Sequence, residues 1–389
     1  MFLSSVQDQD PNFRSVDISA TPVAGLEHRY FDYKLQQKHK GALAVKRFAD
    51  EIYQGKAAYD ACVALRAEGF VPDAILCHGR WGAGLFLKEV FPEAPLLLYS
   101  EYFSTAANSA ICLMPGEKIA PEMQMMYRLA NANNLITLEA ADVIVSPTVF
   151  QKESHPEVFH DRIKVIHDGV DTALYQPAKK PLGEITLGGK VIPAGKEIIT
   201  YVTREFESYR GFETFIRAIA IVLRERPEVE VVIAGGNTGG GYGGAAGAEY
   251  KERVLAAAKP DLSRVHFVGV LPGAEYRLLL QRSSVHVYLT VPFVLSWSMM
   301  EAMATGCALV ASRTAPVEEV VADGKEALLA GLLAPEEVAA AISQLLDEPK
   351  ERARLGAAAR KKIERNYAVP VITEQYKKLI AEMMAAKKI

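Results

Sequence analysis

Short apolar runs alternate with amphipathic segments along most of the chain, and this alternation predicts strands and helices in turn. The runs predicted as strands are Asp73–His78, Leu96–Ser100, Asp142–Ser146, Ile163–Ile166, Ile198–Val202, Val229–Ala234, Val265–Val268, Val285–Leu289 and Cys307–Ala311. The segments predicted as helices are Ala42–Glu68, Gly84–Val90, Pro121–Ala140, Phe212–Glu225, Ala274–Arg282, a segment ending at Gly306, Pro335–Leu346, Glu351–Tyr367 and Ile372–Ala385. Strands that alternate with helices are typical of α/β proteins, in which helices cover both faces of a parallel sheet.

The length of 389 residues exceeds what one core usually supports, so two domains are expected. The stretch Thr172–Lys196 is rich in Pro, Gly and Lys and is predicted as the linker. We therefore expect two Rossmann-like, doubly wound domains, over residues 1–175 and 190–369. The final helix, within 370–389, is expected to pack back on the first domain. Two such domains facing each other would gather the carboxyl ends of their strands around a ligand.

Composition narrows the class of protein. The net charge of −3 gives no support for nonspecific binding of nucleic acid. The four cysteines are scattered without a C-x-x-C pair, which indicates a reducing compartment and no structural zinc. No basic start with a long apolar run opens the chain, so a cytoplasmic location is expected. The basic segment Lys34–Arg47 is interpreted as a solvated helix face, with peripheral contact to anionic lipid at the inner face of the membrane left open as the alternative.

The region from Arg282 to Leu329 carries the strongest chemical signal. A strand runs into a loop and then into a helix, and a helix N-terminus beside a strand end is a site for anions. Ser296, Trp297 and Ser298 are expected to present backbone N–H groups there, while the Trp297 side chain is predicted to anchor the core.

Two arginines are predicted to belong to the same site. Arg204 ends a strand, and Arg210 follows six residues later at a helix start. Two guanidinium groups that converge on one site suit a diphosphate, whereas taken alone they would be read as surface residues in solvated ion pairs.

Several motifs together resemble a known family. R204-E-F-E-S-Y-R210-G, V-I-A-G-G, V-H-F-V-G-V and E301-A-M-A-T-G-C occur in the order and spacing of the retaining glycosyltransferases of family four. The strings H78-G-R-W-G-A-G-L-F-L-K-E-V-F-P and P-F-V-L-S-W-S-M-M-E are similar to one bacterial branch, and the match covers almost all of residues 70–370. The resemblance implies the GT-B fold and a hexosyltransferase of polysaccharide biosynthesis. Such an enzyme moves sugar from a UDP-, GDP- or ADP-sugar to a glycan, lipid-linked or protein acceptor with retention of configuration.

The resemblance also implies roles for individual residues. Arg204, Arg210 and His78 are the expected catalytic residues. The expected donor-binding residues are Gly235, Gly236, Val270, Ser296, Trp297, Ser298 and Glu301. Glu301 is expected to bind ribose hydroxyls, with an S298-x-x-E capping box as the structural alternative. Glu101 ends a strand on the expected acceptor side, and a plain surface carboxylate explains it equally well.

Two departures from the family pattern leave alternatives open. Phe293 occupies the place where most relatives carry a Glu. The chain also begins near the family's second strand, so the first domain is expected to lack one strand and one helix. A sugar-nucleotide epimerase and a non-catalytic subunit or truncated remnant are the alternative functions, and a homo-oligomer is left open. No Asp-x-Asp motif stands in a suitable place, and arginines with a helix terminus can replace a divalent cation, so neither a metal nor a cofactor is expected.

Overall fold

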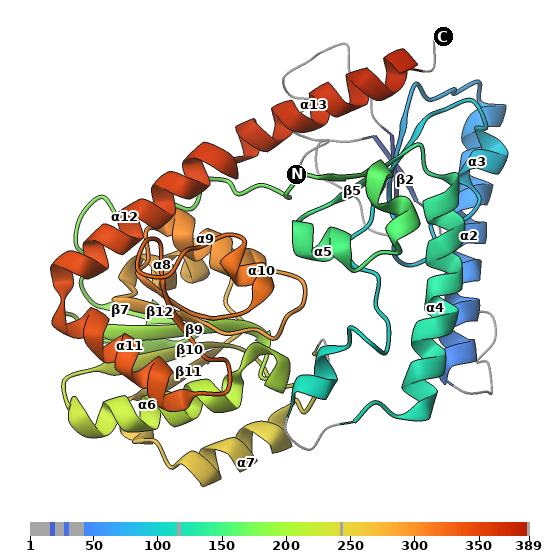
Figure 1. The fold of residues 1–389 in the computed structure, drawn as a ribbon. Coiled ribbons are helices and arrows are strands. Elements are labelled where there is room, and N and C mark those ends of the chain that lie inside the picture. The colour runs from blue at the N-terminus through green and yellow to red at the C-terminus, as the bar shows by residue number, and fades with distance from the viewer. Residues whose placement is uncertain (1–15, 20–26, 31–42, 115–117, 242–243, 387–389) are drawn as a thin grey trace. The chain divides into compact units, whose positions relative to one another are not determined.

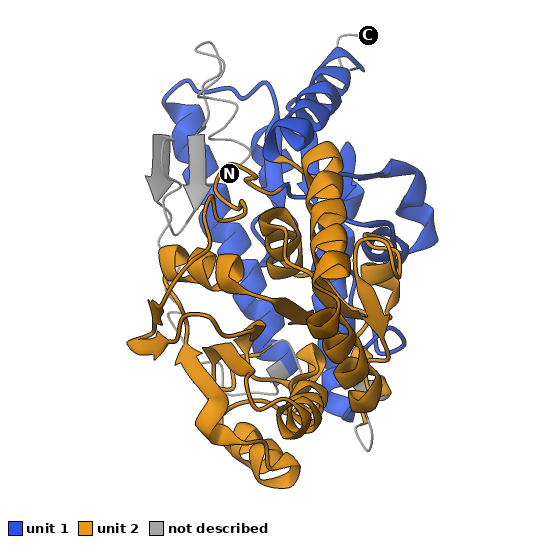
Figure 2. Ribbon diagram, turned by 90° about the vertical axis from the view of Figure 1, so that its left-hand side faces the viewer, with its two compact units in different colours: residues 1–109, 119–169, 369–389 blue, residues 110–118, 170–368 orange. Residues whose placement is uncertain are grey.

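A computed structural model describes residues 16–19, 27–30, 43–114, 118–241 and 244–386. The chain forms two compact units, coloured separately in Figure 2. Unit 1 comprises residues 1–109, 119–169 and 369–389, and unit 2 comprises residues 110–118 and 170–368. Both are α/β units built on parallel sheets, as the apolar pattern predicts.

Unit 1 is built on a four-stranded parallel sheet in the order β3-β4-β5-β6. The strands are β3 (Ile75–His78), β4 (Leu96–Tyr99), β5 (Val143–Ser146) and β6 (Ile163–Val165). The helices are α2 (Leu43–Ala67), α3 (Leu87–Val90), α4 (Pro121–Ala140), α5 (Val149–Glu153), the 3-10 helix η2 (Glu157–Arg162) and α13 (Val369–Ala386).

Helices cover both faces of this sheet because side chains alternate along β4. Leu96 and Leu98 pack with Cys62 of α2 and Leu138 of α4 on one face. On the other face Leu97 packs with residues of α13, including Tyr376 and Leu379. The final helix of the chain is therefore part of the core of unit 1.

The N-terminal strands lie apart from this sheet. β1 (Val16–Ser19) and β2 (Glu27–Tyr30) form a parallel pair of their own, and the apolar pattern predicted no strand before Asp73. The missing family strand and helix stay a prediction, because most of residues 1–42 lie outside the described residues. Most of the basic segment Lys34–Arg47 also lies outside the described residues, and only its last residues, from Leu43, belong to α2.

Unit 2 has a six-stranded parallel sheet in the order β11-β10-β9-β12-β13-β14. The strands are β9 (Ile198–Glu205), β10 (Glu230–Gly236), β11 (Val265–Gly269), β12 (Val285–Tyr288), β13 (Leu309–Ser312) and β14 (Leu328–Ala330). The helices are α6 (Phe212–Glu225), α7 (Ala248–Ala258), α8 (Gly273–Arg282), α9 (Trp297–Thr305), α10 (Ala315–Glu318), α11 (Pro335–Asp347) and α12 (Pro349–Asn366), with 3-10 helices η1 (Ala110–Leu113), η3 (Ser208–Arg210) and η4 (Leu262–Arg264). This is the Rossmann strand order, and it reverses between β9 and β12, where such sheets bind ligands.

Two helical layers enclose the sheet of unit 2. α6 and α11 lie side by side in Figure 1, and Phe215 and Ile342 pack with Val231 and Val287 in one cluster. Met299 and Met303 of α9 pack on the opposite face with Leu309. Apolar stripes at helical spacing explain this burial.

The predicted linker is wrong over part of its length. Residues 170–196 belong to unit 2, and β7 (Ile185–Leu187) pairs with β8 (Lys190–Ile192) in an antiparallel hairpin. Leu187 and Ile192 are fully buried against Ile198 and Val268. The glycines that suggested a linker form the turn of this hairpin: Gly188 and Gly189 both have positive φ, which glycine adopts readily.

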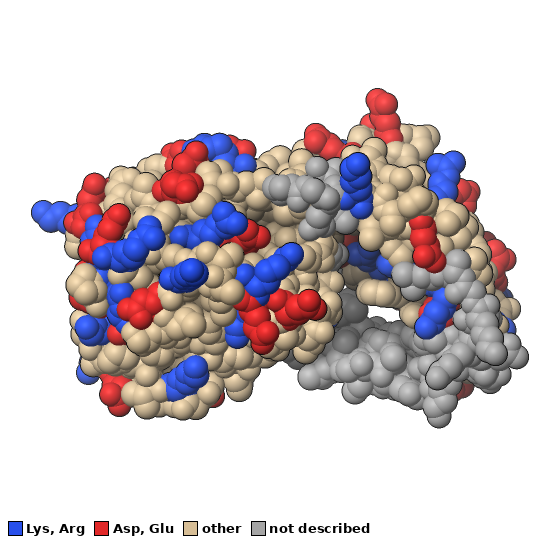
Figure 3. Space-filling view, turned by 90° about the horizontal axis from the view of Figure 1, so that it is seen from below, with Lys and Arg blue, Asp and Glu red and all other residues tan. Residues whose placement is uncertain are grey.

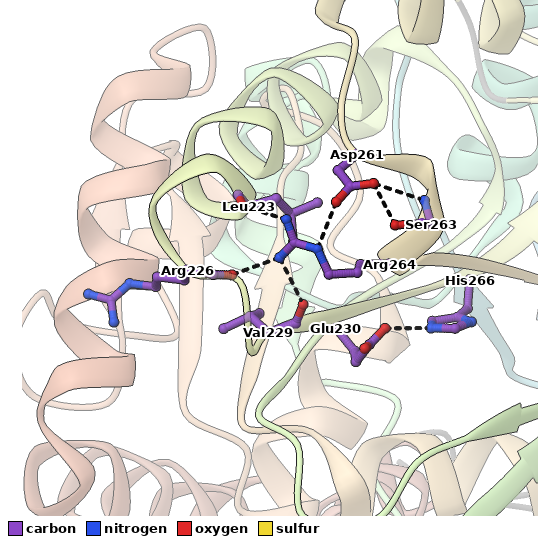
Figure 4. A network of polar contacts seen from close by, with 8 residues as sticks. All are labelled: Leu223, Arg226, Val229, Glu230, Asp261, Ser263, Arg264 and His266. Atoms are coloured by element: carbon purple, nitrogen blue, oxygen red, sulfur yellow. Dashed lines mark hydrogen bonds and ion pairs between the residues drawn. The ribbon is translucent and has the colours of Figure 1, made fainter.

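A polar network centred on Arg264 joins the end of α6 to the segment before β11 (Figure 4). The Arg264 guanidinium donates to the carbonyls of Leu223 (2.5 Å) and Arg226 (2.7 Å) and to Asp261 (2.9 Å). A cation at the last carbonyls of a helix satisfies acceptors that have no partner within the helix. The network thus fixes the C-terminal end of α6 on the β10 side of the sheet.

The charged surface is mixed. On the face shown in Figure 3, Lys and Arg side chains are interspersed with Asp and Glu, in agreement with the small net charge. Of the helices that the structure describes, none combines the length and the apolar character needed to cross a bilayer.

Candidate functional site

A solvent-open hollow of about 340 Å³ lies in unit 2 at the point where the strand order reverses. It is lined by Tyr201, Val202, Thr203, Arg204, Arg210, Tyr288, Leu289, Ser296 and Ser298. These residues come from β9, β12, η3 and the start of α9. Four of the predicted site residues therefore share one hollow, although they are spread over almost a hundred positions of the sequence.

Arg210 is held rigidly at this hollow. It is only 7% exposed, and its guanidinium donates to the Tyr288 hydroxyl (3.2 Å), Thr290 Oγ1 (2.7 Å) and the Val294 carbonyl (3.3 Å). Tyr201 anchors the Arg210 backbone by donating to its carbonyl at 2.7 Å. These bonds hold the guanidinium in a fixed orientation at the hollow.

A glycine places Arg210 in this position. Gly211 has φ +64°, and a Cβ there would lie 2.6 Å from the Leu289 side chain. The turn from η3 into α6 therefore requires glycine. Arg204, in contrast, lies near the end of β9 with an exposed side chain.

The first turn of α9 forms another wall. Ser296 is the N-cap, and its hydroxyl accepts from the Ser298 N–H at 3.3 Å. The Ser296 N–H donates to the Tyr288 hydroxyl at 2.9 Å. The Tyr288 oxygen thus accepts from both the helix start and Arg210. Tyr288 is a residue that the sequence analysis missed, because it reads as one more apolar member of a buried strand.

Two structural interpretations from the sequence are wrong at this helix. Trp297 is 62% exposed rather than a core anchor, because the first residue of α9 points away from the buried face. The capping box is wrong because the N-cap is Ser296, which puts Glu301 beyond the third helical position.

Glu301 instead binds tyrosines. Its carboxylate accepts from the Tyr276 hydroxyl at 2.8 Å, and Tyr175 also bonds to it. Burial raises the pKa of Glu301, and the two tyrosine hydroxyls partly offset this effect. Glu301 does not line the hollow, although it belongs to the helix that does.

The remaining predicted donor-binding residues lie outside the hollow. A Cβ at Gly235 would lie 2.7 Å from the Thr203 carbonyl, and one at Gly236 would lie 2.5 Å from the Glu205 carboxylate. Both positions therefore require glycine, because a larger side chain would collide with these neighbouring atoms of unit 2. Val270 is 76% exposed and follows β11, an edge strand of the sheet.

Glu205 is a second residue that the sequence analysis missed. Its buried carboxylate accepts from the Thr238 N–H (2.8 Å), the Thr238 hydroxyl (2.7 Å) and the Gly239 N–H (3.2 Å). The Thr238 hydroxyl is the main cause that lowers the pKa of this carboxyl. An ionised Glu205 therefore fixes the start of the glycine-rich segment after β10.

The predicted residues of unit 1 lie at adjacent strand ends. His78 ends β3, and its Nδ1 accepts from the Arg80 N–H at 3.2 Å while the ring lies 5.2 Å from that of Tyr99. Desolvation, with a smaller contribution from Arg80, lowers the pKa of His78. Glu101 follows β4, and its carboxylate lies 3.9 Å from the Arg80 guanidinium.

Phe293, at the position where a Glu was expected from the resemblance, makes an edge-to-face contact with Tyr209 at 6.4 Å between ring centroids. Among the described residues, no group of three or more His, Cys, Asp or Glu side chains is placed to hold a metal ion. The cationic groups at the unit 2 hollow are arginines.

Comparison with known proteins assigns the chain to a class of enzyme. Residues 10–175 match a model described as "Glycosyl transferase family 4 group", and residues 188–362 match "Glycosyl transferases group 1". A D-inositol 3-phosphate glycosyltransferase of Corynebacterium efficiens is 27% identical over 97% of this chain and 82% of its own length. An alpha-maltose-1-phosphate synthase of Mycolicibacterium smegmatis is 25% identical over 72% of each chain.

Solved structures agree on the fold. A sucrose-phosphate synthase of Thermosynechococcus elongatus has a TM-score of 0.69 at 19% identity, covering 97% of this chain and 87% of its own. Anabaena HepE in complex with UDP-glucose has a TM-score of 0.66 at 14% identity, covering 99% and 94%. Both units match glycosyltransferase models and the fold is that of these enzymes, so the chain is a glycosyltransferase with the GT-B fold.

Proposed function

We propose that the unit 2 hollow binds the diphosphate of a nucleotide-sugar donor. The observation that carries this proposal is that Arg204 and Arg210 line one hollow with the first turn of α9. A diphosphate has two negative charges, which suit two guanidinium groups and the positive end of a helix dipole. Glu301 would bind the ribose hydroxyls of the same nucleotide.

The proposed reaction is transfer with retention of configuration. The bond between the anomeric carbon and the phosphate oxygen breaks, and the acceptor hydroxyl oxygen attacks from the same face. The departing phosphate takes the acceptor's proton. Charge grows on that phosphate as the sugar leaves, so fixed cations stabilise the transition state more than the ground state.

Unit 1 supplies the remaining proposed contacts. His78 would bind the donor sugar or phosphate, and its lowered pKa favours the neutral imidazole near pH 7. Glu101 would bind acceptor hydroxyls. The acceptor is a glycan, a lipid-linked saccharide or a protein, and transfer proceeds without a divalent metal, so EDTA should leave the initial rate unchanged.

Thermal shift with UDP, GDP and ADP tests the donor site. At least one of the three should raise the Tm in a dose-dependent way, because a ligand at a hundredfold excess over its Kd stabilises the folded state by about 2.7 kcal/mol. Arg204→Ala should weaken that binding at least about tenfold, or about 1.4 kcal/mol. The matched control is Arg217→Ala, an exposed arginine of α6 that pairs with Glu213 at 2.6 Å.

The donor-site proposal fails if no nucleoside diphosphate raises the Tm, or if the Arg204 and Arg217 variants bind equally well. Product analysis separates the transferase from an epimerase, because an epimerase would convert the sugar nucleotide without any acceptor.

A further inference from the structure

A second hollow, open to solvent, lies in unit 1, with about 400 Å³ of empty space when the solvent at its mouth is included. Its walls come from α2, α4 and the loop after β3, and they include Arg47, Arg80, Trp81, Tyr127, Asn131 and Asn134. Neither His78 nor Glu101 lines it. The hollow is therefore distinct from the residues expected to bind the donor or the acceptor.

Helix α4 has buried polar side chains next to this hollow, where a helix usually buries apolar ones, and its Asn131 and Asn134 line the hollow. α4 buries Asn131, Asn133 and Thr137 beside a single leucine, Leu138. Burying an amide is costly unless it is hydrogen-bonded. Asn131 Nδ2 donates to the Ser104 carbonyl at 2.8 Å, so its amide is held in a fixed orientation.

Asn133 of α4 lies outside the lining, but it fixes the Glu51 carboxylate, which lines the hollow from α2. Asn133 Nδ2 donates to the buried Glu51 carboxylate at 2.8 Å, and the other oxygen of that carboxylate lies 3.5 Å from Arg47 Nε. Asn134 Nδ2 donates to Asn131 Oδ1 at 3.2 Å. These bonds make a pre-organised row of amide and guanidinium groups on the walls.

The loop after β3 holds an aromatic ring at this hollow in a strained conformation. Trp81 has φ +73° and is 56% exposed. The loop packs so tightly on α2 that a Cβ at Gly82 would collide with the Glu51 carbonyl, and one at Gly55 would lie 2.7 Å from the Gly82 carbonyl. A left-handed non-glycine residue costs on the order of 1–3 kcal/mol, and such strain clusters at functional sites.

Charge and shape together define the ligand class. The Arg47 and Arg80 guanidinium groups each have a carboxylate near them, Glu51 at 3.5 Å and Glu101 at 3.9 Å, so the local charge is balanced. Amides both donate and accept, which suits hydroxyl groups, and an exposed indole offers a flat apolar face. We propose that this hollow binds an uncharged carbohydrate ring, with its C–H face on Trp81 and its hydroxyls on Asn131 and Asn134.

This inference rests on the proposed function, because the ring would be part of a glycan acceptor. The two sites can nevertheless be tested separately, since the chain has two tryptophans, Trp81 in unit 1 and Trp297 at the start of α9. Trp297→Phe leaves Trp81 as the only indole reporter, and Trp81→Phe leaves Trp297.

The experiment is a fluorescence titration of the full chain with the methyl glycosides of glucose, galactose, mannose and N-acetylglucosamine. In Trp297→Phe, at least one glycoside should change Trp81 emission saturably, with a Kd of about 1 mM, as expected for a few hydrogen bonds and one ring contact. The same glycoside should leave the emission of Trp81→Phe unchanged.

Asn134→Ala in the Trp297→Phe background should weaken that glycoside at least about fivefold, or about 1 kcal/mol. Gln124→Ala is the matched control, since it removes an exposed amide of α4 that does not line the hollow. The inference is overturned if no neutral glycoside changes Trp81 emission up to about 50 mM. It is also overturned if Asn134→Ala binds like the control, or if only phosphorylated or uronic acid glycosides bind. Nucleoside diphosphates titrated into Trp81→Phe report on the donor site alone, so its failure would be seen separately.

Discussion

Removing one hydroxyl group, in the variant Tyr288→Phe, tests how the proposed donor site is held together. The Tyr288 oxygen accepts from Arg210 Nη1 at 3.2 Å and from the Ser296 N–H at 2.9 Å. Tyr288 is 3% exposed, and phenylalanine keeps its ring, so the change leaves no large cavity. The variant therefore removes the link between the arginine and the first turn of α9 and little else.

The magnitude follows from these two bonds. A neutral hydrogen bond contributes about 1 kcal/mol and one to a charged group about 1.5–3 kcal/mol, so unit 2 should lose roughly 2.5–4 kcal/mol of stability. Without the hydroxyl, Arg210 keeps its bonds to Thr290 and to the Val294 carbonyl, but it loses the oxygen that it shares with Ser296, so the arginine and the start of α9 are no longer held to each other. We expect the affinity for the nucleoside diphosphate to fall about tenfold, or about 1.4 kcal/mol.

Calorimetric titration with the nucleoside diphosphate that stabilises the wild type measures this loss. The control is Tyr99→Phe in unit 1, which removes the 2.6 Å hydrogen bond from its hydroxyl to Asp168. The control should lower stability without changing nucleotide affinity. Equal or tighter nucleotide binding by Tyr288→Phe would refute the view that this hydroxyl orients the two groups.

Two further predictions concern buried titratable groups. His286 is fully buried, and burial lowers its pKa to about 4, against 6.5 in the unfolded chain. Between these two pH values the unfolded state binds more protons than the folded state. The free energy of unfolding should therefore fall as the pH drops from about 6.5 to about 4. That loss is on the order of 3 kcal/mol. Denaturant unfolding at several pH values should show the loss in the wild type and not in His286→Gln. Identical pH profiles of the two proteins would contradict the burial argument. In Glu301→Gln the side chain can still accept from Tyr276. The variant should bind a nucleoside diphosphate more weakly by about 1–2 kcal/mol. Its binding of inorganic pyrophosphate should not change, because only the nucleotide carries ribose. Equal losses for both ligands in competition titrations would argue against a ribose contact.

The sequence predicted most of the regular structure because its signals are local. Strands such as β9 and helices such as α6 have apolar periodicity, and the prediction of two parallel α/β domains is confirmed by the observed sheets. The hairpin at residues 185–192 was mistaken for a linker, because its turn glycines and lysines obscure the two buried residues Leu187 and Ile192. β1 and β2 are too short and too polar to give an apolar run.

Side-chain partners were less predictable, because they depend on packing between distant segments. The register of α9 decides that Ser296 is the N-cap, and this single shift explains why Trp297 is exposed and why the capping-box interpretation of Glu301 is wrong. Tyr288 and Glu205 gave no signal, since a tyrosine in a buried strand and a glutamate at a strand end are ordinary residues. Their roles come from the hydroxyl and carboxylate contacts that the fold creates.

The central claim is that two guanidinium groups and the start of α9 together hold a diphosphate. The most direct test is a crystal structure of the full chain grown with the nucleoside diphosphate that most raises its Tm. We predict diphosphate oxygens within hydrogen-bonding distance of Arg204, Arg210 and the first turn of α9. A diphosphate bound elsewhere on the chain, with the Arg204 side chain directed away from it, would contradict the account.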